Sequence, residues 1–112
     1  MSATVRVLLY HLTDDEPGIR EAYHKVSAAL AGVPGLLGNE LLHSVHDIRG
    51  FVVLSTWQDR AAFDRWEQGA AHQGDTAPLR RFRDVANPFA LGIFEVVAEH
   101  GSTAPDRGER IE

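Results

Sequence analysis

The chain has 112 residues, 44% of them apolar, and a formal net charge of −5 at pH 7, which suits one domain with a single core. It contains no cysteine, so disulfides, thiolate nucleophiles and cysteine-ligated metals are excluded. The negative charge argues against binding of nucleic acid, because phosphate recognition needs a clustered basic surface. No apolar run approaches the roughly 20 residues of a membrane span, and the N-terminus lacks a signal-peptide pattern. We therefore expect a cytoplasmic protein that binds neither nucleic acid nor membrane.

The first part of the chain predicts a strand followed by a helix. Residues 5–11 (VRVLLYH) are rich in β-branched and aromatic side chains. Residues 13–17 (TDDEP) are typical of a helix N-terminus. Apolar side chains then recur three and four positions apart, which predicts an amphipathic helix over about 16–31 that ends at Gly32.

The next segments predict a hairpin and a second helix. Residues 36–45 and 50–57 are apolar runs separated by a polar, turn-sized interval. Residues 58–71 place their apolar side chains on one side and most of their charged side chains on the other, as an amphipathic helix does. A short further helical piece is expected to begin at Pro78.

Residues 89–99 (FALGIFEVVAE) predict a fourth strand, and residues 101–112 form a polar tail that we expect to be disordered. The order β-α-β-β-α-β is that of the ferredoxin-like α+β fold, a four-stranded antiparallel sheet with two helices on one face. We expect residues 1–100 to form this domain.

The predicted strands are apolar at nearly every position over residues 5–10, 51–54 and 93–98. A sheet with one face in water should alternate apolar and polar residues. Both faces are therefore predicted to be buried, and two helices cover only one of them. We expect the second face to pack against another copy of the chain, giving a symmetric homodimer.

Three segments resemble the antibiotic biosynthesis monooxygenase (ABM) superfamily, whose members are dimeric ferredoxin-like α+β barrels. They are residues 33–36 (VPGL), residues 51–57 (FVVLSTW), and residues 61–66 (AAFDRW) leading to His72. The resemblance covers roughly residues 4–99. The superfamily includes quinone-forming oxygenases, heme-degrading oxygenases, isomerases and members of unknown role.

Similarity to the quinone-forming members implies oxidation of a polycyclic phenol or anthrone by O2 without metal, heme or flavin. Trp57 matches the tryptophan that ends the third strand of those enzymes. The asparagine found four residues before it is Val53 here, and the tyrosine six residues after it is Phe63. The catalytic hydrogen bonds of this chain must therefore differ from theirs.

Similarity to the heme-degrading branch is the alternative within the superfamily. The tryptophan of its second helix matches Trp66, but its heme-ligating histidine falls ten residues later, where this chain has Thr76. Its first-strand asparagine is absent from residues 5–10. His72 could replace the ligand only with a different local geometry.

The candidate catalytic residues are His72, to move a proton, and Trp57 and Trp66, to enclose the substrate. An unperturbed imidazole titrates near pH 6.5, which suits a general base. The structural alternatives are that both tryptophans belong to the core and that His72 sits at the favourable C-terminal dipole of the second helix. Possible substrate contacts are listed as Phe63, Asn39, Tyr23 and Arg81.

Two further possibilities stay open. A metal site could combine His11 with His43 or His46, although residues three apart on a strand point to opposite faces; our expectation is no metal and no cofactor. The protein could also be a non-catalytic small-molecule binding or accessory protein of the same fold. An inward-pointing His72 would favour catalysis, whereas an apolar pocket without a titratable group would favour binding alone.

Overall fold

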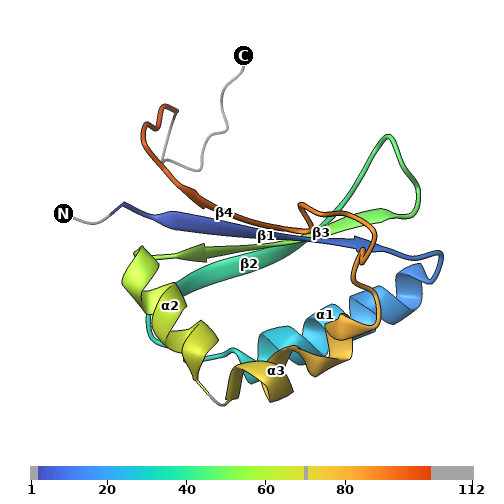
Figure 1. The fold of residues 1–112 in the computed structure, drawn as a ribbon, viewed down its shortest axis with the longest axis horizontal. Helices are drawn as coiled ribbons and strands as arrows, with labels where there is room; N and C mark the ends of the chain where they lie inside the picture. Colours follow the sequence, from blue (N-terminus) through green and yellow to red (C-terminus); the bar gives the residue numbers. More distant parts are fainter. Residues whose placement is uncertain (1–2, 70, 102–112) are drawn as a thin grey trace.

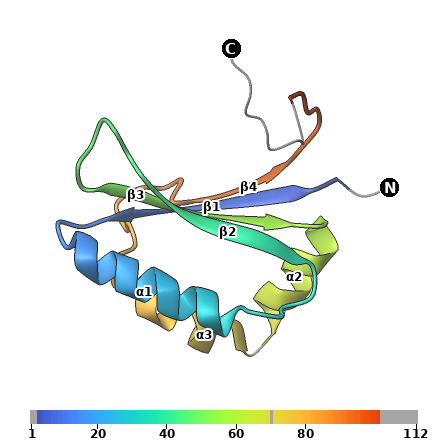
Figure 2. The same ribbon diagram turned by 180° about the vertical axis from the view of Figure 1, so that it is seen from behind.

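The computed structural model describes residues 3–69 and 71–101. Its elements, in chain order, are β1 (Val5–Leu12), α1 (Glu16–Ala29), β2 (Leu36–His43), β3 (Gly50–Trp57), α2 (Arg60–Gln68), α3 (Ala71–Arg80) and β4 (Leu91–Glu95). The four strands form an antiparallel sheet of order β2-β3-β1-β4. All three helices lie on one face of this sheet (Figures 1 and 2). The predicted ferredoxin-like α+β fold is confirmed.

The central strand β1 sets which side chains face the helices. It pairs with β3 and with β4, and Val5 lies opposite Trp57 while His11 lies opposite Phe51. Val5, Val7 and His11 are buried, and successive strand residues point to opposite faces. The odd-numbered side chains of β1 and their partners on β3 therefore face the helices, and the even-numbered ones face away.

The start of α1 follows from its capping residue. The side chain of Asp15 accepts a hydrogen bond from the backbone N–H of Gly18 at 2.9 Å, which satisfies one of the unpaired donors of the first turn. Ile19, Ala22 and Val26 form the buried stripe. The predicted helix is confirmed, with its end two residues earlier than expected.

The second helical region differs from the prediction of one helix over 58–71. Asp59 caps α2, which ends at Gln68, and Gly69 is extended with φ −75° and ψ 152°. A new helix, α3, then begins at Ala71 and contains Pro78 in its interior instead of at its start. A glycine loses more conformational entropy in a helix than other residues do, which favours the end of α2 at Gly69. Residue 70 lies outside the described residues.

Two strands are shorter than predicted. β2 ends at His43, two residues early, and β4 runs only over Leu91–Glu95. Backbone hydrogen bonds from Tyr10 to Ala90 and from Val96 to Thr4 continue the pairing by one residue at each end of β4. The predicted disordered tail lies, from residue 102 onward, outside the described residues. Within the described part of the chain, each helix is too short or too polar to cross a bilayer.

Residues 33–36 (VPGL) connect α1 to β2 and pack against the start of α2. Gly35 has a φ of +86°, and a Cβ atom at this position would collide with the Cβ atom of Ala62. Its carbonyl oxygen accepts a hydrogen bond from the N–H of Gln58 at 2.8 Å. Only glycine allows this backbone to come so close to α2, so the segment fixes where α2 begins.

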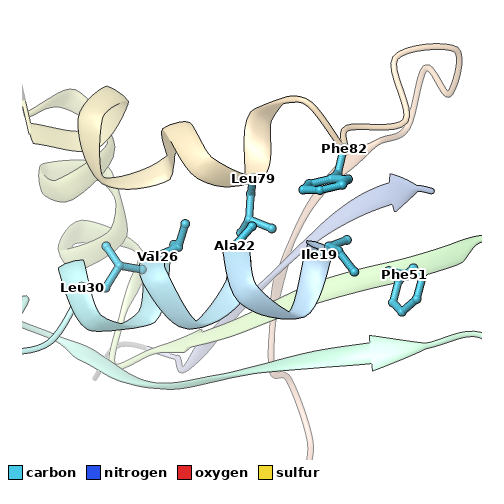
Figure 3. Packing of buried hydrophobic residues seen from close by; sticks show 7 residues of the cluster. All are labelled: Ile19, Ala22, Val26, Leu30, Phe51, Leu79 and Phe82. Atoms are coloured by element: carbon cyan, nitrogen blue, oxygen red, sulfur yellow. The ribbon is translucent and has the colours of Figure 1, made fainter. Parts of the chain in front are cut away.

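The core consists of two clusters instead of one. The larger one joins α1, α3 and the start of β3 (Figure 3); its members are Ile19, Ala22, Val26, Leu30, Phe51, Leu79 and Phe82. The smaller one joins β1, the end of β3 and α2; its members are Val5, Val7, Trp57, Ala62 and Phe63. Partly buried side chains, including Trp66, pack against both.

His11 is the polar residue buried among these clusters, with 1% of its surface exposed. Neither ring nitrogen has a hydrogen-bond partner among the described residues. Burial is the main reason that the pKa of His11 is lowered from 6.5 to about 4. The Leu9 backbone near the ring acts against this shift, although it completes no hydrogen bond with the ring. The positive charge of Arg83 adds to the shift. The imidazole is therefore neutral at pH 7.

This burial makes stability depend on pH. Below pH 6.5 the unfolded chain binds a proton at His11, whereas the folded chain does so only near pH 4. The free energy of unfolding should therefore fall by about 3 kcal/mol from this group as the pH drops through that window. Urea denaturation between pH 4 and pH 7 should show a flatter dependence for His11→Leu, while the exposed-site control His24→Leu should follow the wild type. Parallel curves for His11→Leu and wild type would contradict the assignment.

Candidate functional site

A cavity of about 420 Å³ lies between the sheet and the helices. All four strands, all three helices and the segment after α3 contribute to its walls. It borders both core clusters: Val26 and Leu79 come from the larger, and Trp57 and Phe63 from the smaller. The two clusters leave this space because neither extends over the whole helix-facing side of the sheet.

One end of the cavity is an aromatic wall. The ring centroids of Trp57 and Trp66 are 5.3 Å apart, and those of Trp57 and Phe63 are 5.5 Å apart in an edge-to-face arrangement. Phe63 and Trp66 are separated by 6.1 Å. These are ordinary spacings for aromatic packing, so the three rings stabilise one another. Trp57 and Phe63 are buried, and Trp66 is the partly exposed ring of the three.

The two tryptophans differ in how their indole N–H groups are satisfied. Trp57 is fully buried, and its Nε1 donates to the Ser55 hydroxyl at 2.9 Å. The Nε1 of Trp66 is buried without a partner among the described residues. A buried polar group without a partner costs free energy, so Trp66 retains a donor that a bound molecule can use. The indole N–H of Trp57, by contrast, is already engaged by Ser55.

The break at Gly69 brings His72 to this wall. In a continuous helix, His72 would lie roughly 120° around the axis from Trp66. In the structure its ring stands edge-on to Trp66, with centroids 4.5 Å apart, and it lines the cavity. His72 occupies the first turn of α3, so the expected C-terminal helix dipole does not apply and that structural explanation is wrong.

Tyr23 and Asn39 also line the cavity. The Tyr23 hydroxyl donates to the Asn39 carbonyl oxygen at 3.0 Å, and the Ser27 hydroxyl donates to the Asn39 side-chain oxygen at 3.0 Å. These bonds tie α1 to β2. Tyr23 and Asn39 therefore form a polar patch in which both oxygen atoms of Asn39 already accept hydrogen bonds.

The charged side chains that line the cavity differ from the one predicted, Arg81. Arg80, Arg83 and Glu67 line the cavity, whereas Arg81 does not. The guanidinium carbon of Arg81 lies 4.1 Å from the centre of the Phe82 ring, a cation–π contact outside the cavity. The structure therefore brings together Trp57, Phe63, Trp66, His72, Tyr23 and Asn39 from the predicted set.

His11 lines the cavity, although from the sequence it was a candidate only for a metal site. It lines the cavity together with Val7 and Leu9 of the same strand. His11 shares one face of β1 with Val5 and Val7, and this spacing could have indicated that its side chain is buried. Within the described residues, no group of three or more histidine and acidic side chains is placed to hold a metal. His43 instead stacks on Phe51, with ring centroids 4.2 Å apart.

The arrangement is suited to one class of chemistry. It offers a mainly apolar space, a π wall, an imidazole at that wall, and a second imidazole that is neutral at pH 7. Such a space can bind a planar aromatic molecule and move a proton to or from it. Proton removal makes a phenol or anthrone an electron-rich anion that can reduce O2.

Comparison with known proteins agrees with this architecture. Residues 4–74 match the family model described as antibiotic biosynthesis monooxygenase. A heme oxygenase (mycobilin-producing) from Mycobacterium tuberculosis is 32% identical over 90 residues, which cover 78% of this chain and 81% of that protein.

Two solved structures have the same fold at low identity. The cofactor-independent oxygenase SnoaB from Streptomyces nogalater has a TM-score of 0.67 at 17% identity, over 95% of this chain and 100% of that one. A heme-degrading protein from Mycobacterium tuberculosis has a TM-score of 0.69 at 23% identity, over 91% of this chain and 100% of that one. Together, the match of the family model and the sequence identity show that this chain belongs to the antibiotic biosynthesis monooxygenase family.

Proposed function

We propose that the protein is a cofactor-independent monooxygenase that oxidises a planar, polycyclic phenol or anthrone to a quinone. The observation that carries this proposal is the placement of His72 against Trp66 at the wall of an aromatic-lined cavity. Trp57 and Phe63 are buried and hold the partly exposed Trp66 in place, so Trp66 is the ring against which the substrate lies. SnoaB, a cofactor-independent oxygenase with the same fold, supports the proposal.

For an anthrone, the proposed reaction balances without another oxidant. His72 takes a proton from the methylene carbon, and the anion transfers one electron to O2. The resulting radical and superoxide combine in a C–O bond, and the proton from His72 completes a hydroperoxide. His72 then removes the second proton from that carbon, the O–O bond breaks, and water leaves with the quinone carbonyl formed. The protein's part is to orient the ring and transfer protons.

Heme degradation is a second candidate, favoured by the 32% identity to the Mycobacterium tuberculosis heme oxygenase. The residues do not fit that branch. At the position of its histidine ligand stands Thr76, whose hydroxyl donates to the His72 carbonyl oxygen at 2.9 Å. β1 carries no asparagine. The one imidazole on this side of the cavity, His72, packs edge-on against Trp66.

Oxygen consumption tests the proposed function. Metal-free protein with a panel of anthrones and polycyclic phenols should consume O2 and form quinone absorbance. His72→Ala should lower the rate about 100-fold or more, as expected for loss of a general base. His24→Ala, which alters an exposed histidine on α1, should leave the rate unchanged. Circular dichroism should show both variants folded.

The outcomes separate the three candidates. Equal rates for His72→Ala and wild type would remove His72 from the mechanism. Uptake only after addition of hemin would contradict the proposal and support heme degradation. Binding of the panel without uptake under either condition would leave a non-catalytic binding or accessory protein as the function.

We propose further that the protein works as a homodimer joined through the sheet face opposite the helices. That face carries apolar side chains from all four strands, with Phe94 58% and Leu42 41% exposed. Leu8 and Leu54 lie opposite each other at its centre. Figures 1 and 2 show no helix over this side of the sheet. Burial of such a face against a second copy removes apolar surface from water.

Sedimentation equilibrium at micromolar concentration should give about twice the chain mass of 12.3 kDa. Leu54→Glu should shift the protein to the monomer, because a carboxylate would be buried at the centre of the interface. Val85→Glu, at a loop position that is 92% exposed, is the matched control and should remain dimeric. A wild-type mass near 12.3 kDa would refute the dimer.

A further inference from the structure

His11 is a buried polar group that the proposed proton transfers do not use. It is 1% exposed, and both of its ring nitrogens lack a hydrogen-bond partner among the described residues. Leaving a buried imidazole unpaired is costly, whereas an apolar side chain of similar size would not be. Its ring borders the same cavity as Trp66, whose indole N–H is also buried and unpaired.

These two unpaired groups lie toward opposite ends of the cavity. Trp66 packs against Trp57, which is opposite Val5 at the start of β1, whereas His11 is six residues further along that strand. Arg83 pairs with His11 through an isolated bridge and lines the cavity at the same end. A ligand that contacts both groups must extend along the cavity from Trp66 to His11.

We propose that His11 is a substrate-binding residue that forms a hydrogen bond with an oxygen substituent at the far end of a fused-ring substrate. This inference rests on the proposed function and narrows its substrate class to elongated polycyclic phenols, with the reacting ring at Trp66 and His72. A neutral imidazole has one donor and one acceptor nitrogen, so it can bond a hydroxyl as acceptor or a carbonyl as donor.

The charge and protonation of the surroundings fit a neutral oxygen better than a cation. The charged or titratable side chains that share the cavity are Tyr23 on α1, Glu67 on α2, His72 and Arg80 on α3, and Arg83. Of these, Arg83 acts electrostatically on His11 and helps to keep it uncharged. A phenolic hydroxyl or quinone carbonyl is thus the group that this end can accept.

A comparison of two ligands tests the hydrogen bond. The chain's two tryptophans both line the cavity, so energy transfer from them reports on binding of 2-hydroxyanthracene and of anthracene under anaerobic conditions. His11→Leu should weaken binding of 2-hydroxyanthracene about tenfold more than binding of anthracene, the loss expected for one hydrogen bond. His11→Gln should restore part of the difference, and His24→Leu should change neither affinity.

Nitrogen NMR of the wild type provides a test that requires no variant to fold. With 15N-labelled histidine, the His11 ring signals should shift when 2-hydroxyanthracene binds and should stay in place when anthracene binds. Equal losses for both ligands in His11→Leu, or unmoved His11 signals with bound 2-hydroxyanthracene, would overturn the inference while leaving the proposed function intact. Failure of the wild type to bind either ligand would overturn both.

Discussion

The division of the core into two clusters is the constraint on which the rest of the structure depends. One cluster joins α1 and α3 to the start of β3, and the other joins α2 to the end of β3. Protein interiors are normally packed to the density of organic crystals, and the space of about 420 Å³ lies where the two clusters meet, partly open to solvent. Trp66 packs against both clusters and lines this space.

The helix break at Gly69 is the local feature that places an imidazole, His72, at the cavity. It lets α2 keep Phe63 and Trp66 on Trp57 while α3 turns to pack against α1. His72 then reaches the ring of Trp66 from the first turn of α3. A site formed in this way depends on two short helices held by separate clusters, so changes in core packing at Phe82 or Ala62, which do not line the cavity, would alter the site without touching it directly.

The fold could be predicted from the sequence because its signals are local. Alternating or continuous apolar strands, the Asp15 and Asp59 caps and the glycine-ended helices each act within a few residues. The position of α3 could not be predicted in the same way, because Pro78 lies inside a helix whose stability comes from packing Leu79 against α1. Likewise, only the assembled sheet shows that His11 is buried beside the cavity and that Arg83 rather than Arg81 lines it.

We propose that the protein itself, without metal or organic cofactor, inserts one oxygen atom from O2 into an aromatic substrate held at Trp66 and His72. The most direct measurement is mass spectrometry of the quinone formed from an anthrone under 18O2, using protein treated with a chelator and freed of heme and flavin. We expect one 18O atom at the oxidised carbon and protein-dependent formation of the product. Quinone carrying oxygen from water, or product that forms only after a metal or heme is restored, would contradict it.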